Sequence, residues 1–296
     1  MKLLSALVKS LRPRQWTKNL LLFAGLIFTG NMKDMHLLGR SVLAFILFCA
    51  LSGVMYLVND IRDIESDRQH PEKRNRPIAS GELPVHVALT SAFLLGVPAL
   101  GISYFLGVDF GNCALVYVVL VTLYSLKFKN HVIIDLLIVA LGFVVRAVAG
   151  IEAMAINGKA PEVTPWFLAC TLFLALFLAI CKRRHEITLL NNRAPEHRQV
   201  LEEYSPAFLD QMVAVATTTT VLSYALWSTI GKFASFHMIL TLPFVLYGIF
   251  RYLYLVYRKE EGGAPESILL KDRPLQINIL LWVISIIILI YFYKSA

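Results

Sequence analysis

Long runs of apolar residues recur along this chain of 296 residues. Most of them reach about 18 residues, which is enough for a helix to cross the ~30 Å hydrocarbon core of a bilayer. Apolar residues make up 57% of the chain and charged residues 16%, whereas soluble domains have roughly 45–50% and about 25%. The strands of a transmembrane β-barrel alternate apolar and polar residues, and these runs do not alternate. The sequence therefore predicts an all-α polytopic membrane protein.

Nine transmembrane helices are predicted, and the first of them is the shortest. They cover roughly residues 17–30, 37–58, 84–106, 111–127, 132–151, 164–181, 207–230, 236–257 and 275–293. We expect them to form one transmembrane domain, residues 1–296. Before the first span, Leu3, Leu4 and Leu7 follow helical spacing opposite Lys9, which predicts an interfacial amphipathic helix over residues 1–14.

Basic residues are distributed unequally between the two ends of the predicted spans. If the N-terminus is cytoplasmic, the segments on that side hold 21 of the 28 Lys and Arg residues. This asymmetry predicts a cytoplasmic N-terminus and puts residues 59–83 and 182–205 on the cytoplasmic side. We expect these two segments to be the active-site loops of a plasma-membrane protein. The same rule, with attraction to the anionic lipid of the bilayer, accounts for the net charge of +8. We therefore expect no nucleic-acid partner, and the oligomeric state, including a homo-oligomer, is left open.

An acidic motif stands at the cytoplasmic end of the second span. It contains Asn59, Asp60, Asp63 and Asp67, and if the helix continues, all four lie within about 100° of one another on its surface. Converging carboxylates repel each other unless a cation lies between them, and oxygen ligands favour Mg²⁺, which takes further ligands from substrate phosphates. The motif therefore predicts a Mg²⁺ site for a diphosphate, with these four residues as ligands; a solvated helix end is the alternative.

Basic residues follow this motif in the loop that leads to the third span. Lys73, Arg74 and Arg76 are predicted to bind phosphate oxygens. The alternative is that they are topology signals only.

A second polar group follows the sixth span. Lys182, Arg183 and Glu186 lie within about one helical turn, so they predict either a substrate site or a structural pair on one helix. Arg146 lies inside the fifth span, and ionisable residues at that depth are functional candidates.

The pattern Asn59-Asp60-x-x-Asp63-x-x-x-Asp67 resembles the first aspartate-rich motif of the UbiA superfamily of membrane prenyltransferases. Four further segments resemble, more narrowly, the phosphoribosyl-transferring branch of that superfamily. They are Arg12-Pro13-Arg14-Gln15-Trp16-Thr17-Lys18-Asn19, residues 67–79, Tyr124-Ser125-Leu126-Lys127, and Lys182-Arg183 with Glu186. The similarity covers nearly the whole chain.

The resemblance implies a nine-helix bundle and a Mg²⁺-dependent transfer of 5-phosphoribosyl from phosphoribosyl pyrophosphate to a polyprenyl phosphate, for cell-wall precursor synthesis. Asp60, Asp63 and Asp67 are then the catalytic residues. The candidate substrate-binding residues are Lys18, Lys73, Arg74, Arg76, Tyr124, Lys127, Arg146, Lys182, Arg183 and Glu186.

One departure from the superfamily pattern concerns the second polar group. Members acting on aromatic acceptors carry a second aspartate-rich motif where this chain has Lys182, Arg183 and Glu186, which favours a phosphate clamp over a second metal. Two alternatives stay open: a prenyltransferase that joins a prenyl diphosphate to an aromatic acceptor in quinone synthesis, and a membrane transporter of a polyanion.

Overall fold

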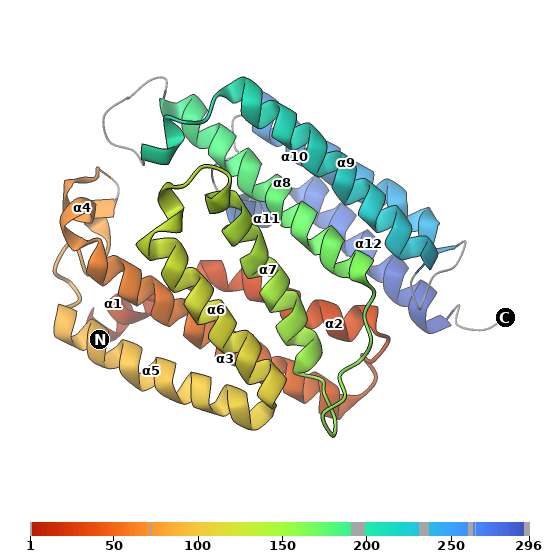
Figure 1. Cartoon of the computed structure of the whole chain (residues 1–296), viewed down its shortest axis with the longest axis horizontal. Helices are drawn as coiled ribbons and strands as arrows, with labels where there is room; N and C mark the ends of the chain where they lie inside the picture. The colour runs from red at the N-terminus through yellow and green to blue at the C-terminus, as the bar shows by residue number, and fades with distance from the viewer. Residues whose placement is uncertain are drawn as a thin grey trace. The chain divides into compact units, whose positions relative to one another are not determined.

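The computed structural model describes residues 2–71, 73–190, 199–230, 237–259, 263 and 265–292. Regular structure in these residues is helical, apart from one isolated bridge between Ile156 and Lys159 (Figure 1). Of the predicted active-site loop 182–205, residues 191–198 lie outside the described residues.

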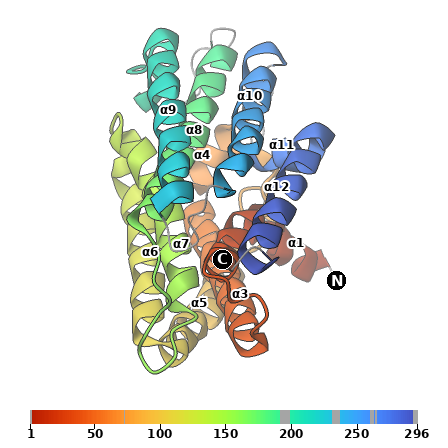
Figure 2. The same ribbon diagram turned by 90° about the vertical axis from the view of Figure 1, so that its right-hand side faces the viewer.

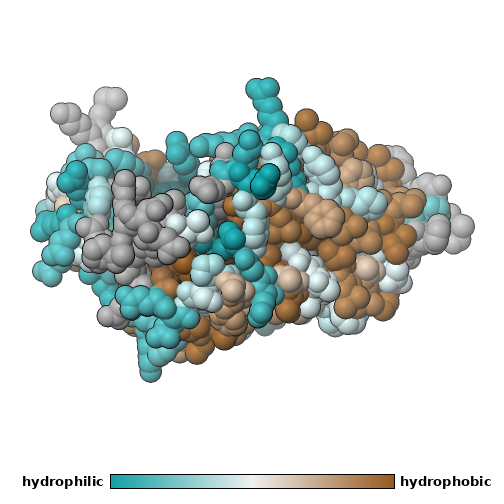
Figure 3. Space-filling model, turned by 90° about the horizontal axis from the view of Figure 1, so that it is seen from above, coloured by the Kyte–Doolittle hydropathy of each residue, from teal (hydrophilic) through white to brown (hydrophobic). Residues whose placement is uncertain are grey.

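Eight of the described helices are long and apolar enough to cross a bilayer. They are α3 (Met35–Arg62), α5 (Val85–Leu106), α6 (Val108–Leu126), α7 (Ile134–Glu152), α8 (Pro165–Leu190), α9 (Pro206–Ile230), α10 (Leu242–Arg258) and α12 (Arg273–Phe292). Large apolar side chains such as Phe93 and Phe105 are exposed on them, and hydrophobic residues cover much of the surface seen in Figure 3. This surface is what helices that face lipid require. The chain is therefore an all-α, multi-pass membrane protein.

The first predicted span, residues 17–30, does not form one long helix. The 3₁₀ helix η1 (Pro13–Leu21) and the seven-residue α2 (Leu22–Phe28) replace it, and because they are contiguous they rise roughly 28 Å together. A Cβ at Gly150 of α7 would lie 2.1 Å from the Leu22 carbonyl oxygen. The start of α2 thus touches the backbone of a neighbouring helix. Eight of the nine predicted spans are therefore long helices in the described residues. The first is a 3₁₀ helix followed by a short α-helix, and its crossing of the bilayer stays a prediction.

The described residues group into two compact units. The first comprises Met1–Leu26, Met32–Lys127 and Val145–Pro161. In it α3, α5 and α6 lie side by side (Figure 1), and α4 (Ile64–Gln69) and η2 (Lys73–Asn75) follow α3.

The N-terminal helix α1 (Lys2–Ser10) packs against α3 in this unit. Its Ala6 joins a buried cluster with Leu57, while Leu3 and Leu4 are exposed. A helix therefore forms within the predicted segment, and Ala6 and Leu7 provide the face that contacts protein; its interfacial position stays a prediction.

The second unit comprises Ile27–Asn31, Phe128–Val144 and Glu162–Ala296. Helices α8 and α9 pack closely, and α10 contacts α9 and α12 (Figure 2). The remaining short elements are η3 (Phe128–Asn130), η4 (Gln199–Leu201), η5 (Met238–Thr241) and α11 (Pro265–Lys271). The core of this unit is built around Phe177, Ile180, Leu209 and Tyr252, which are all buried.

Candidate functional site

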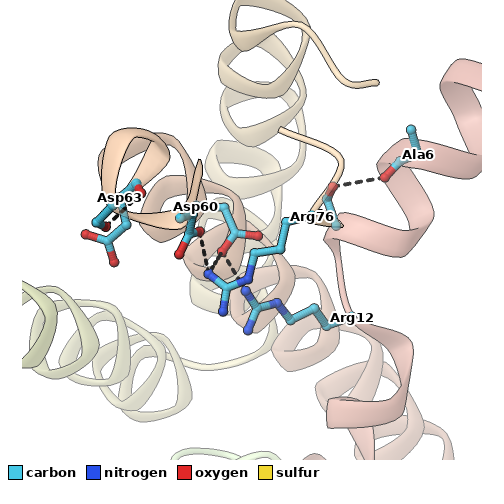
Figure 4. Close-up of polar contacts among 8 residues, drawn as sticks. Ala6, Arg12, Asp60, Asp63 and Arg76 are labelled. Carbon is cyan, nitrogen blue, oxygen red and sulfur yellow. Dashed lines mark hydrogen bonds and ion pairs between the residues drawn. The ribbon is translucent and has the colours of Figure 1, made fainter. Parts of the chain in front are cut away.

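The acidic motif surrounds the point at which α3 ends. Asp60 and Asp67 are 2% and 3% exposed, so each buried carboxylate requires a compensating positive charge. Arg76 supplies it to both, because its Nη1 donates to Asp60 Oδ1 at 3.1 Å and to Asp67 Oδ2 at 2.6 Å. Arg12 donates from Nη2 to the same Asp60 oxygen, and Figure 4 shows both guanidinium groups directed toward Asp60.

Local structure fixes the position of each arginine. Arg12 follows α1 with a left-handed φ of 52° and precedes Pro13, which begins η1. Its guanidinium also lies 4.6 Å from the centre of the Tyr56 ring, within the range of a cation–π contact.

Arg76 lies in a loop that folds back onto the protein. Ile78 and Leu83 in this loop are buried, and the Leu83 amide donates to the Pro77 carbonyl at 2.8 Å. Burial of these two apolar side chains anchors the segment that carries Arg76.

The expectation that four residues share one helical face is met only in part. The helix is interrupted at Asp63, which is the C-cap of α3 and precedes α4. Asp60 and Asp67 converge on one arginine, whereas the Asp63 carboxylate points away from Arg76 in Figure 4. Within the described residues, no three His, Cys, Asp or Glu side chains are grouped closely enough to hold a metal ion. The ligand roles of Asn59, Asp60, Asp63 and Asp67 stay predictions.

Arg146 belongs to a buried polar network in the first unit. It donates from Nε to Asn19 Oδ1 at 2.8 Å and from Nη2 to the Tyr117 hydroxyl at 2.9 Å. The Asn19 amide in turn donates to Ser52 Oγ at 3.2 Å, so α7, η1 and α3 are joined. Arg146 is 7% exposed, and its visible contacts bind helices together; its predicted substrate role is untested.

The second polar group is held in the second unit by a carboxylate on α7. Asp135 is 0% exposed; Arg183 donates from Nε to its Oδ2 at 2.9 Å, and Tyr204 donates its hydroxyl to Oδ1 at 2.7 Å. Arg183 also donates from Nη1 to Glu186 Oε2. Burial raises the pKa of Tyr204, so its hydroxyl remains a donor at ordinary pH.

Ile133 has a backbone conformation that a β-branched residue seldom adopts. Its φ is +67°, which costs about 1–3 kcal/mol. Its amide donates to the Tyr204 hydroxyl at 2.6 Å. This strained turn therefore precedes Asp135, which lies in the first turn of α7, and its hydrogen bond from Ile133 joins the turn to Tyr204.

The other predicted substrate residues are distributed over both units. In the first unit, Lys18 lies in η1, Lys73 and Arg74 in η2, and Tyr124 and Lys127 at the end of α6. Arg62 donates to the Ser125 carbonyl at 2.6 Å and so joins the ends of α3 and α6. Lys182 lies on α8 in the second unit.

Three partners of these residues were not predicted from the sequence. Arg12 was part of a recognised motif, but nothing in the sequence paired it with Asp60. Asp135 could have been found from the sequence, because a carboxylate at the start of an apolar run is a candidate for burial and then needs a partner. No local sequence pattern pointed to Tyr204.

Comparison with known families and proteins agrees with the resemblance found in the sequence. The UbiA prenyltransferase family matches residues 20–280. A decaprenyl-phosphate phosphoribosyltransferase of Corynebacterium glutamicum is 37% identical over 98% of this chain and 88% of its own length. Enzymes of that name from Mycolicibacterium smegmatis and Mycobacterium tuberculosis are 36% and 33% identical, over 98% and 96% of this chain and 94% of each relative.

Solved structures show the same fold at lower identity. A UbiA homologue from Archaeoglobus fulgidus bound to GPP and Mg²⁺ aligns with a TM-score of 0.72 at 20% identity, covering 96% of this chain and 99% of that one. A UbiA homologue from Aeropyrum pernix aligns with a TM-score of 0.65 at 13% identity, covering 91% and 96%. These similarities establish the helical fold.

Proposed function

The chain belongs to the UbiA prenyltransferase family, and we propose that it transfers 5-phosphoribosyl from phosphoribosyl pyrophosphate to a polyprenyl phosphate. The observation that carries this proposal is similarity over nearly the whole chain to enzymes named decaprenyl-phosphate phosphoribosyltransferase. The departure at Lys182, Arg183 and Glu186, where aromatic prenyltransferases carry further aspartates, supports the same choice. The product would serve the synthesis of lipid-linked sugar precursors of the cell envelope.

The proposed reaction is a substitution at the ribose C1. An oxygen of the prenyl phosphate attacks C1, the bond from C1 to the pyrophosphate oxygen breaks, and pyrophosphate leaves with the electron pair. Positive charge develops on the sugar as in other glycosyl transfers. The prenyl phosphate is already an anion at neutral pH, so the protein needs to position and neutralise phosphates more than it needs a strong general base.

The acidic motif suits a magnesium ion by its chemistry. Its donors are carboxylate and amide oxygens, which Mg²⁺ prefers, and in the structure the Arg76 guanidinium holds the position of a cation between Asp60 and Asp67. Asn59, Asp63 and Asp67 would hold the ion, with Asp60 as a further ligand or supporting group. When bound, Mg²⁺ neutralises the charge that develops on the departing pyrophosphate.

We assign the basic residues to binding phosphates and Glu186 to the donor sugar. Lysine and arginine side chains bind phosphate directly, whereas a carboxylate such as Glu186 accepts a hydrogen bond from a ribose hydroxyl. The positive-inside asymmetry supports a cytoplasmic location for this chemistry, at the plasma membrane. The candidates for phosphate binding are Lys18, Lys73, Arg74, Arg76, Lys127, Lys182 and Arg183.

The transfer of a prenyl group to an aromatic acceptor is the nearest alternative within the same family. Solved structures of the same fold contain GPP or DMAPP with Mg²⁺, so the fold accommodates prenyl diphosphates. The family match and the near-full-length similarity to phosphoribosyltransferases favour a transferase over a transporter.

The test is to supply the purified protein in lipid or detergent with Mg²⁺, phosphoribosyl pyrophosphate and a prenyl phosphate. We expect release of pyrophosphate and a phosphoribosyl lipid detected by mass spectrometry. Parallel reactions would contain a prenyl diphosphate and an aromatic acid. Consumption of that second pair, with phosphoribosyl pyrophosphate left untouched, would overturn the proposal.

A further inference from the structure

Two neighbouring arginines of α8 each belong to a group of one tyrosine, one aspartate and one arginine. The first group, which we call the Tyr204 triad, consists of Tyr204, Asp135 and Arg183. The Tyr204 hydroxyl donates to Asp135 at 2.7 Å, and Arg183 Nε donates to the other oxygen of that carboxylate at 2.9 Å.

The Tyr257 triad repeats the same chemistry with Tyr257, Asp210 and Arg184. The Tyr257 hydroxyl donates to Asp210 Oδ1 at 2.6 Å, and Arg184 Nε donates to the same oxygen. The Arg184 guanidinium also lies 3.9 Å from the centre of the Tyr257 ring. This triad joins α8, α9 and α10.

The two triads differ in burial and in where they end. Side-chain exposure is 0% for Asp135 and 6% for Arg183, against 41% for Asp210. The Tyr204 triad continues through Arg183 Nη1 to Glu186, whose side chain is 29% exposed. The Tyr204 triad is thus a buried chain of hydrogen bonds that emerges at one carboxylate, whereas the aspartate of the Tyr257 triad is itself exposed.

We propose that Tyr204 and Asp135 are positioning residues that act through Arg183 to hold Glu186 where it accepts a hydrogen bond from the donor's ribose hydroxyl. This rests on the proposed function, which assigns Glu186 to the donor sugar. A planar guanidinium held at Nε by one carboxylate fixes the direction in which Nη1 donates to the next. Asp135 therefore sets the orientation of Arg183, and Arg183 sets that of Glu186.

The strained turn supports this assignment. Ile133, with its φ of +67°, donates its amide to the Tyr204 hydroxyl at 2.6 Å. One hydroxyl thus accepts from the strained backbone and donates to Asp135. Unfavourable backbone geometry persists where the surroundings over-determine it, and such positions gather at functional sites.

The experiment measures steady-state kinetics of Tyr204→Phe with each substrate varied in turn. Phenylalanine keeps the ring and removes only the hydroxyl. We expect the KM for phosphoribosyl pyrophosphate to rise roughly tenfold, as for the loss of one hydrogen bond in a buried polar network, with kcat and the KM for prenyl phosphate little changed. Tyr257→Phe is the matched control, because it removes the same hydroxyl from the same kind of triad, and its kinetics should match the wild type.

A double-mutant cycle separates positioning from general loss of structure. If Tyr204 acts through Glu186, Tyr204→Phe should have no further effect on the donor KM in a Glu186→Gln background. An equal effect in both backgrounds, or equal rises in KM for both substrates, would overturn the inference. Should Tyr204→Phe fail to fold, Asp135→Asn replaces it in the cycle. Its effect on the donor KM should likewise disappear in the Glu186→Gln background, and an equal effect in both backgrounds would overturn the inference. A wild-type protein that ignores phosphoribosyl pyrophosphate refutes the proposed function instead, a result visible before any variant is made.

Discussion

Replacing Arg76 by glutamine tests whether Asp60 and Asp67 form a site for a cation. Asp60 keeps its contact with Arg12 in this variant, whereas Asp67 loses the guanidinium that it contacts at 2.6 Å. Breaking a buried ion pair costs about 3–5 kcal/mol. Because the Arg76 side chain is 27% exposed, solvent screens part of this, and we expect a loss of about 2–3 kcal/mol in the free energy of unfolding.

Magnesium should restore much of this loss if the carboxylates bind it. A ligand at 100 times its dissociation constant stabilises the folded state by about 2.7 kcal/mol. The assay is denaturant unfolding of the purified protein in detergent, with EDTA and with a series of Mg²⁺ concentrations. Arg76→Gln should be the less stable protein in EDTA, and it should gain more stability from Mg²⁺ than the wild type, because glutamine does not compete for the carboxylates.

Arg68→Gln provides the control in the same segment, because Arg68 Nε donates to the Ala79 carbonyl at 3.1 Å and, among the described residues, no carboxylate is paired with it. Its stability should respond to Mg²⁺ as the wild type does. The reasoning is refuted if Arg76→Gln is as stable as the wild type in EDTA, or if the two proteins respond identically to Mg²⁺.

The metal site, a charge pair and the topology each lead to one further prediction. Asp63→Asn should lower turnover on the order of 10²-fold in a protein that still folds, whereas Glu65→Gln, at an exposed position, should retain activity. Near-normal turnover of Asp63→Asn at limiting Mg²⁺ would count against the metal site. The Arg251 hydrogen bond lowers the pKa of Asp272. The stability that this carboxylate contributes is therefore present above its ordinary pKa of ~3.9 and is lost as the pH falls through the lower folded-state value. Unfolding of Asp272→Asn and of the wild type across acidic pH checks this. A reporter fused to the C-terminus should be active only outside the cytoplasm, and cytoplasmic activity would mean that residues 13–28 do not cross the bilayer.

The helices that form the body of the protein were predictable because their signal is local. A run of about 20 apolar residues has one stable conformation in lipid, since a helix satisfies every backbone hydrogen bond within the segment. Eight predicted spans accordingly became long helices. Residues 17–30 differ, because they form a 3₁₀ helix and then a short α-helix, and the start of that α-helix lies against Gly150, a residue far along the sequence.

The sequence by itself determined the membrane class and the family, and it supplied the candidate site residues, because apolar length, charge asymmetry and motif spacing are properties of the linear chain. Tertiary structure alone decided which polar groups meet. Arg12 contacts Asp60 across 48 residues, Arg183 contacts Asp135 across 48, and Arg146 contacts Asn19 across 127. A buried charge requires a partner, but a linear pattern cannot say which one, since helix packing selects it.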